Sequence, residues 1–245
     1  MPASLQHAVT RAMKGRDGAV AVLGISDGAL LARHRPDFMK SSEAPPGSAV
    51  KPFTLKALLR TGVPTALCRR TLTINGQRLD CSHPPASEPL TAADALALSC
   101  NSWFAATASK LLPDLLWREF NAAGLTAGVA RTRDALILQA LGIGGVQCSP
   151  LALARAYRRL ALDQSKPEPQ FAPIYEGLAE SVKRGASIAA GPAVLGKTGT
   201  TRDGAWFAGF NNAIVLAVYL FHGTGGAGAA PVAGEVFAAW RAASR

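Results

Sequence analysis

Ser48 and Lys51 have the residue types and the spacing of a nucleophile with its own base. They follow Pro45-Pro46-Gly47, a run that ends regular structure and leads the chain into a helix. Three residues apart, the two side chains would share one face of that helix, so the amine could take the hydroxyl proton. The helix dipole would favour negative charge developing there. Alone, the pair equally describes a helix N-cap followed by a solvated lysine.

Two further short motifs follow in the chain, Ser99-Cys100-Asn101 and Lys197-Thr198-Gly199-Thr200. Taken singly, the first could be a helix N-cap and the second a solvated strand end. The order Ser-x-x-Lys, Ser-x-Asn, Lys-Thr-Gly is, however, the signature of penicillin-binding proteins and class A β-lactamases. Three weak motifs in the right order make a far more specific pattern than any one of them.

The chain resembles the transpeptidase domain of class B penicillin-binding proteins from about Ala19 to about Trp240. It departs from the usual family pattern in having Ala49 and Val50 in place of Thr and Phe, and in carrying Gly204 as an insertion. The segments that carry the resemblance beyond the three motifs are Pro46–Phe53, Leu141–Gly144, Ser149–Ala154 and Asp203–Phe210.

The resemblance implies a D,D-transpeptidase that acts on D-Ala-D-Ala stem peptides of peptidoglycan through a serine acyl-enzyme, with β-lactams as substrate mimics. Ser48 would be the nucleophile and Lys51 its base, kept neutral by a nearby second cation, Lys197. Ser99 would relay a proton to the leaving amine, and Asn101 would orient a substrate amide.

The last motif is expected to bind the substrate. The hydroxyls of Thr198 and Thr200 can hold a carboxylate, and Gly199 lets the backbone approach the substrate closely. By resemblance, the backbone N–H groups of Ser48 and Thr200 would form the oxyanion hole. No cofactor is required for this chemistry.

Two other functions use the same motifs. A β-lactamase needs a deacylating base, which in class A enzymes is a glutamate, and no Glu-x-x-Leu-Asn segment lies between Asn101 and Lys197. Hydrolysis is therefore less favoured than transfer to an amine. The third alternative is a non-catalytic penicillin-sensing or scaffold domain of the same fold.

Three cysteines and one histidine, Cys68, Cys81, His83 and Cys100, occur within one region. They could form a tetrahedral zinc site, although their spacing is not that of a standard zinc finger. A Cys68–Cys81 disulfide closing a hairpin at Asn75-Gly76 is the preferred interpretation, and unpaired core thiols are another. Some elongation-type members of the resembled family look similar here, with Cys and His between the first two motifs.

Composition limits the location and the partners. With 26 Lys plus Arg against 16 Asp plus Glu, the net charge is +10. The positive residues are scattered and only three tyrosines are present, which disfavours nucleic acid and suits anionic cell-wall polymer or membrane. Neither a signal peptide nor a transmembrane run is apparent. Since the resemblance places the protein in the periplasm or cell envelope, we expect a fragment, or export with a cell-wall or membrane-anchored partner.

The 245 residues predict a single α+β transpeptidase domain. Strands at both ends would form an antiparallel sheet of about five strands flanked by helices, as the sheet lobe of residues 1–47 and 191–245. Residues 48–190 would form an inserted all-helical lobe. Residues 33–44 are expected to be irregular, and residues 101–120 and 174–190 each to form one helix.

Overall fold

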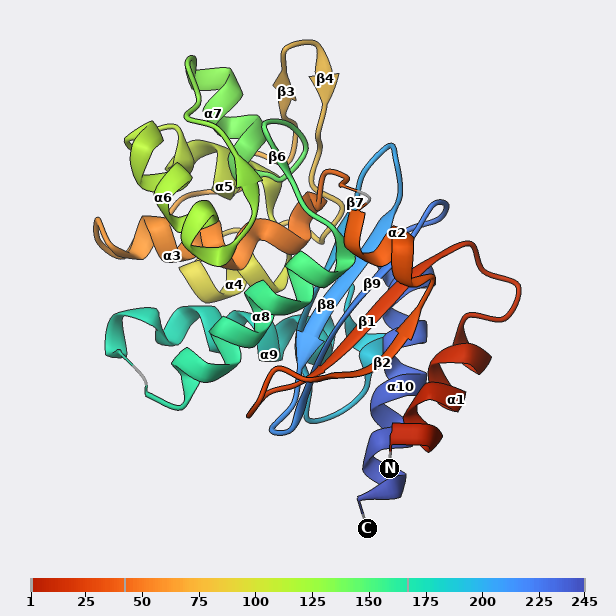
Figure 1. The fold of residues 1–245 in the computed structure, drawn as a ribbon. Coiled ribbons are helices and arrows are strands. Elements are labelled where there is room, and N and C mark those ends of the chain that lie inside the picture. The colour runs from red at the N-terminus through yellow and green to blue at the C-terminus, as the bar shows by residue number, and fades with distance from the viewer. Residues whose placement is uncertain (1, 42, 167, 245) are drawn as a thin grey trace.

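The computed structural model describes residues 2–41, 43–166 and 168–244, and its centre is a five-stranded antiparallel sheet (Figure 1). The strand order is β2-β1-β9-β8-β7, so the N-terminal hairpin joins the C-terminal strands through the β1–β9 pair. This confirms the predicted fold class. The strands are β1 (Gly18–Gly24), β2 (Leu30–His34), β7 (Leu195–Thr200), β8 (Ala205–Phe210) and β9 (Ile214–Leu220).

Every residue of β1, β8 and β9 is buried because helices cover both faces of the sheet. One face packs on α1 (Pro2–Ala12) and α10 (Ala230–Ala243), which lie side by side in Figure 1. The opposite face packs on α8 (Pro150–Gln164). Small side chains on that face let α8 approach closely; they are Ala19, Ala21, Ala208 and Ala217.

The remaining helices form a lobe to the left of the sheet in Figure 1. They are α3 (Lys51–Leu59), α4 (Ala92–Ala97), α5 (Asn101–Ala108), α6 (Pro113–Ala123), α7 (Arg133–Ala140) and α9 (Ala172–Arg184). Two small two-stranded sheets complete this lobe, so it is not all-helical as predicted. They are formed by β3 (Thr73–Ile74) with β4 (Gln77–Arg78), and by β5 (Thr126–Ala127) with β6 (Val146–Gln147).

Three local predictions were wrong. Residues 33–44 were expected to be irregular, but they contain α2 (Pro36–Ser41). Residue 42 of this segment lies outside the described residues. The single helix expected over residues 101–120 is two helices, because Pro113 cannot continue a helix and starts α6 at its first position. The helix expected to reach residue 190 ends at Arg184, where Gly185 adopts an extended backbone.

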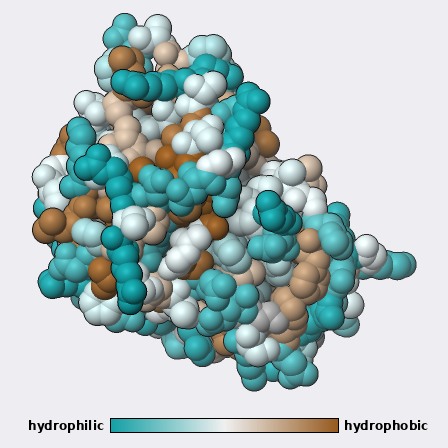
Figure 2. Space-filling view, turned by 90° about the horizontal axis from the view of Figure 1, so that it is seen from above, coloured by the Kyte–Doolittle hydropathy of each residue, from teal (hydrophilic) through white to brown (hydrophobic). Residues whose placement is uncertain are grey.

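The surface is mostly polar, with apolar atoms exposed in small patches on the face seen from above (Figure 2). Among the exposed apolar side chains, Val63 and Leu112 of the helical lobe have exposed fractions of 71% and 69%. In the described part of the chain, no helix combines the length and the apolar character needed to cross a membrane.

Candidate active site

Ser48 and Lys51 are positioned by the 3₁₀ turn η1 (Gly47–Val50), which runs directly into α3. Residues three apart eclipse one another in a 3₁₀ turn, so both side chains lie on the same side. The backbone N–H of Lys51 donates to the carbonyl of Ser48, which fixes this geometry. Ser48 is half-buried, whereas the Lys51 side chain is fully buried.

The Lys51 amine connects the first two motifs. Its Nζ donates to Asn101 Oδ1 at 2.6 Å, to the Ser99 carbonyl at 2.9 Å and to Ser99 Oγ at 3.3 Å. Within the described residues the Ser48 hydroxyl has no hydrogen bond, so a proton transfer to Lys51 would require the two groups to come closer. Catalytic hydrogen bonds in free enzymes are often long in this way.

Ser99 and Asn101 sit at the start of α5, where the backbone is unusual. Ser99 has a φ of 56°, a left-handed conformation that is uncommon for serine and often marks functional sites. Cys100 is the N-cap residue of α5, as the alternative interpretation of this motif expected. Asn101 Nδ2 donates to the Leu79 carbonyl at 3.0 Å, leaving its second N–H for a substrate.

Lys197 to Thr200 lie on β7, an edge strand of the sheet, so one side of its backbone is not used by the sheet. This strand passes directly against η1. A Cβ at Gly199 would lie 2.1 Å from the Pro46 carbonyl oxygen, so only glycine permits the approach. The contact sets Thr198 and Thr200 beside the Ser48 turn. Thr200 Oγ1 also accepts a hydrogen bond from Gly225 N at 3.0 Å.

Burial dominates the electrostatics of the two lysines. Desolvation lowers the pKa of Lys51 to about 7, and the effect is opposed by the neighbouring Cys100 and Cys81. Desolvation also lowers the pKa of Lys197 well below its usual value, and the charge of Lys51 lowers it further. The pair therefore resists carrying two protons, which leaves a neutral amine available at neutral pH. Repulsion between the two lysines was expected from the sequence, whereas the larger effect of burial depends on the fold.

The predicted Cys68–Cys81 disulfide is not formed, because Cys68, Cys81, Cys100 and Cys148 are all free. Instead, one ligand atom from each of Cys68, Cys81, His83 and Cys100 lies within 4.8 Å of all the others. The Cys81 and Cys100 sulfurs are 3.7 Å apart, and Cys68 Sγ is 3.6 Å from His83 Nε2.

These four side chains also have the outer contacts that metal ligands need. His83 Nδ1 lies 2.7 Å from the Pro84 carbonyl, which can only accept, so the proton sits on Nδ1 and the Nε2 lone pair faces Cys68. Backbone N–H groups donate to the sulfurs of Cys68, Cys81 and Cys100 at 3.4 Å each. The hydrogen bond from the Cys100 thiol is the main cause that lowers the pKa of Cys81, to about 4.

Two aromatic residues that the sequence analysis did not place in the site hold the Ser48 turn. Tyr157 on α8 donates from its hydroxyl to the Ala49 carbonyl at 2.8 Å. Trp206 Nε1 on β8 donates to the Pro45 carbonyl at 2.9 Å. Both are aromatic residues with a hydrogen-bonding group, and such a group needs a partner when it is buried.

Known proteins share both the sequence pattern and the fold. A family model described as the penicillin-binding protein transpeptidase domain matches residues 19–240. No curated protein matches the chain. Among solved structures, PBP2 of Pseudomonas aeruginosa in complex with WCK 5153 aligns with a TM-score of 0.83 and 22% identity, covering 97% of this chain and 74% of that one.

Two further structures are similar at 22% identity and a TM-score of 0.80. The alignment with an imipenem acyl-enzyme complex of penicillin-binding protein A from M. tuberculosis covers 96% of this chain and 78% of that chain. The alignment with a peptidoglycan glycosyltransferase from Burkholderia ambifaria covers 99% of this chain and 96% of that chain. At these identities the likeness shows the fold, while the family model spans most of the sequence. The chain therefore belongs to the penicillin-binding protein transpeptidase domain family.

Proposed function

We propose that this protein is a serine D,D-transpeptidase that acts on D-Ala-D-Ala stem peptides of peptidoglycan and is acylated by β-lactams. The observation that carries the proposal is the buried amine of Lys51. This residue lies one turn after Ser48, and its amine donates hydrogen bonds to Ser99 and Asn101. A fully buried lysine is costly when it has no ion pair, as is the case for Lys51 among the described residues, and a depressed pKa of about 7 suits a general base.

In the proposed reaction, Ser48 Oγ attacks the carbonyl of the penultimate D-Ala while Lys51 takes its proton. The backbone N–H groups of Ser48 and Thr200 stabilise the oxyanion. Ser99 passes a proton to the departing amine of the terminal D-Ala, whose carboxylate is held by Lys197, Thr198 and Thr200. An acceptor amine then attacks the Ser48 ester, forms the new amide and releases the serine.

The test is labelling with a fluorescent penicillin, followed by intact mass of the purified chain. Wild type should gain one penicillin adduct, and Ser48→Ala and Lys51→Ala should each lose nearly all labelling because they act as a unit. Thr200→Ala should lose less, since its backbone donor remains. Lys56→Ala is the matched control, because Lys56 lies on the same helix but pairs with Asp163. Absence of an adduct on wild type, or its persistence on Ser48→Ala, contradicts the proposal.

The alternative functions predict different outcomes in the same experiment. A hydrolase would turn over nitrocefin and lose its adduct, whereas a transpeptidase should be labelled and turn over poorly. A scaffold domain would take up no adduct. The proposal also places the protein in the periplasm or cell envelope, near its peptidoglycan substrate. Fractionation that finds the native product solely in the cytoplasm would favour the scaffold.

We also propose that Cys68, Cys81, His83 and Cys100 hold a structural zinc ion. In tetrahedral zinc sites with Zn–S bonds of about 2.3 Å, neighbouring ligand atoms lie about 3.7 Å apart. The separations of 3.7 Å and 3.6 Å between ligand atoms agree with that value. The set of three thiols and one imidazole is one that zinc prefers. Bound there, the ion would brace the β3–β4 segment against the start of α5.

Metal analysis and thiol titration, with and without a chelator, test the zinc proposal. The purified chain should carry one zinc per molecule, and the chelator should release it and expose three reactive thiols. Cys68→Ser should lower zinc content, whereas Cys148→Ser, a buried cysteine outside the cluster, should keep it. Metal-free protein whose thiol reactivity is unchanged by the chelator contradicts the proposal.

A further inference from the structure

A groove of about 610 Å³ lies on the helical lobe, between the β3–β4 hairpin and the helices α5 and α7. Apolar side chains line it from three elements: Ile74 of β3, Ala105 of α5 and Ile137 of α7. Leu67 also lines the groove and has an exposed fraction of 55%, so a large apolar side chain is open to solvent there. We call this space the hairpin groove. It is formed by residues other than those of the three sequence motifs.

The β3 strand presents a free backbone edge to the hairpin groove. The Leu79 N–H donates to the Leu72 carbonyl at 2.7 Å, so these two residues form a hydrogen-bonded pair. Hydrogen-bonded and non-hydrogen-bonded pairs alternate along an antiparallel ladder, which makes Thr73 and Arg78 a non-hydrogen-bonded pair. The N–H and C=O of Thr73 therefore point away from β4. Thr73 lines the groove, and in Figure 1 β3 is the strand of the hairpin on the side of α7.

A free strand edge beside an apolar groove favours an extended peptide as the occupant. The unpaired N–H and C=O groups of an edge strand are a template for a further strand. A hairpin with two paired residues in each strand is marginally stable by itself, so a third strand would stabilise it. In strand addition, main-chain hydrogen bonds supply affinity, while every second side chain of the peptide enters the groove. A ligand without a peptide backbone would leave this edge unpaired.

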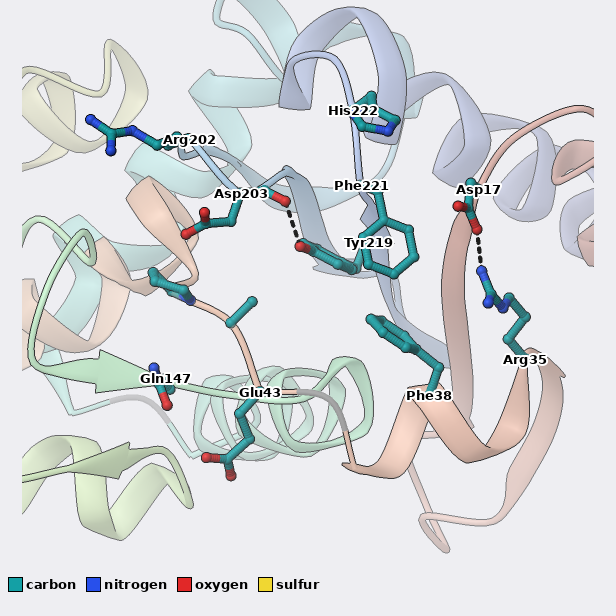
Figure 3. A pocket seen from close by; sticks show the side chains of 12 residues that line it. Asp17, Arg35, Phe38, Glu43, Gln147, Arg202, Asp203, Tyr219, Phe221 and His222 are labelled. Carbon is teal, nitrogen blue, oxygen red and sulfur yellow. Dashed lines mark hydrogen bonds and ion pairs between the residues drawn. The ribbon is translucent and has the colours of Figure 1, made fainter.

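The charges at the hairpin groove favour an acidic peptide. Arg69 and Arg133 both line the groove and are exposed, and within the described residues neither forms an ion pair. Among the described residues that line the groove, none is acidic. A separate cavity of about 910 Å³ on the sheet side differs in this respect, because Asp17, Glu43 and Asp203 line it (Figure 3). A carboxylate in the hairpin groove would therefore meet two arginines and no competing acid.

We propose that the hairpin groove is a docking site for an acidic peptide segment of a partner protein, which adds to the free edge of β3 as a third strand. The apolar side chains of the segment pack against α5 and α7, and its carboxylates pair with Arg69 and Arg133. This inference stands apart from the proposed transpeptidase activity, because it uses none of the proposed catalytic residues and its test measures binding alone.

Fluorescence anisotropy of a labelled peptide tests the docking site in the full chain. The probe is the capped peptide Asp-Val-Thr-Val-Thr-Val-Asp, whose three valines share one face of a strand. It should bind saturably, and a matched peptide with Asn in place of both Asp should bind about tenfold more weakly, because two exposed ion pairs are lost. The affinity for the acidic peptide should fall equally in Arg69→Gln/Arg133→Gln. It should persist in Arg155→Gln, whose exposed side chain lies on α8.

Two further measurements test the strand addition itself. The bound peptide should slow the hydrogen exchange of the Thr73 amide in NMR spectra, because that N–H gains an acceptor. The Leu79 amide, which is already bonded within the hairpin, should change less. N-methylation of every second residue blocks one edge of the peptide strand. Of the two complementary N-methylated peptides, one should therefore bind about tenfold more weakly and the other should keep its affinity.

Several results would overturn the docking site. They are the absence of saturable binding, an affinity that survives in the double arginine variant, and unchanged exchange of the Thr73 amide at saturation. If decanoate binds at the two arginines and the peptide does not, the groove takes an anionic chain and not a strand. If the free chain dimerises in sedimentation and Arg69→Gln/Arg133→Gln does not, the occupant is a second copy of this chain. Either result replaces the acidic peptide of a partner protein.

Discussion

The pH dependence of acylation gives a quantitative test of Lys51 as the base. Only the neutral amine can accept the Ser48 proton, and burial lowers its pKa to about 7. The neutral fraction then rises from about one-tenth at pH 6 to about nine-tenths at pH 8, so the acylation rate should increase about tenfold and level off above. A solvated lysine with a pKa near 10.4 would instead give an increase of about a hundredfold over the same interval, with no plateau.

The measurement is the second-order rate of adduct formation with a fluorescent penicillin, read by intact mass from pH 5.5 to pH 9. Intact mass separates the Ser48 ester from hydrolysed penicillin in solution. A flat profile would mean that Lys51 does not act as the base. A hundredfold rise without a plateau would mean that burial does not depress its pKa. Burial and the charge of Lys51 also lower the pKa of Lys197.

Two further predictions concern the packing that holds the Ser48 turn. Gly199→Ala should nearly abolish labelling, because the added Cβ would lie 2.1 Å from the Pro46 carbonyl oxygen. The control Gly128→Ala, whose Cβ would have no atom within 4 Å, should be labelled normally. Equal labelling of both variants would refute the close approach of β7 to the Ser48 turn. Tyr157→Phe should lower the free energy of unfolding, measured by urea denaturation, by about 1–3 kcal/mol, because the buried Ala49 carbonyl loses its donor. An unchanged free energy of unfolding would mean that the hydrogen bond from Tyr157 to Ala49 does not stabilise the fold.

The sequence predicted the sheet well because its strands are buried on both faces. The apolar runs over residues 19–25 and 213–221 leave no alternative to a central strand, and they pair along their whole length as β1 and β9. The errors fell on segments whose structure depends on partners. The α2 helix has a polar sequence but buries Met39. Among the described residues, the ring partners of Phe38 are Tyr219 of β9 and Phe221.

Motif order named candidate site residues, but their contacts could not be predicted from the sequence. Ser48, Lys51 and Asn101 were candidates from motif order alone, whereas the hydrogen bond from Lys51 to Asn101 joins residues 50 positions apart and requires the fold. The preference for a disulfide failed for a related reason. A hairpin suggested that Cys68 and Cys81 face each other, but Cys81 lies closest to Cys100, which belongs to another element.

The backbone at Ser99 links the cysteine cluster to the proposed catalytic residues. A serine in the left-handed region costs of order 1 kcal/mol or more, so its φ of 56° persists only where neighbours hold it. The Ser99 carbonyl accepts from Lys51, and Asn101 ties the next turn to Leu79. Cys100, between them, is fixed by the cluster and by Trp103 N. Loosening Cys100 would therefore release Ser99 from the Lys51 amine, so cluster variants should lose acylation before they lose the fold.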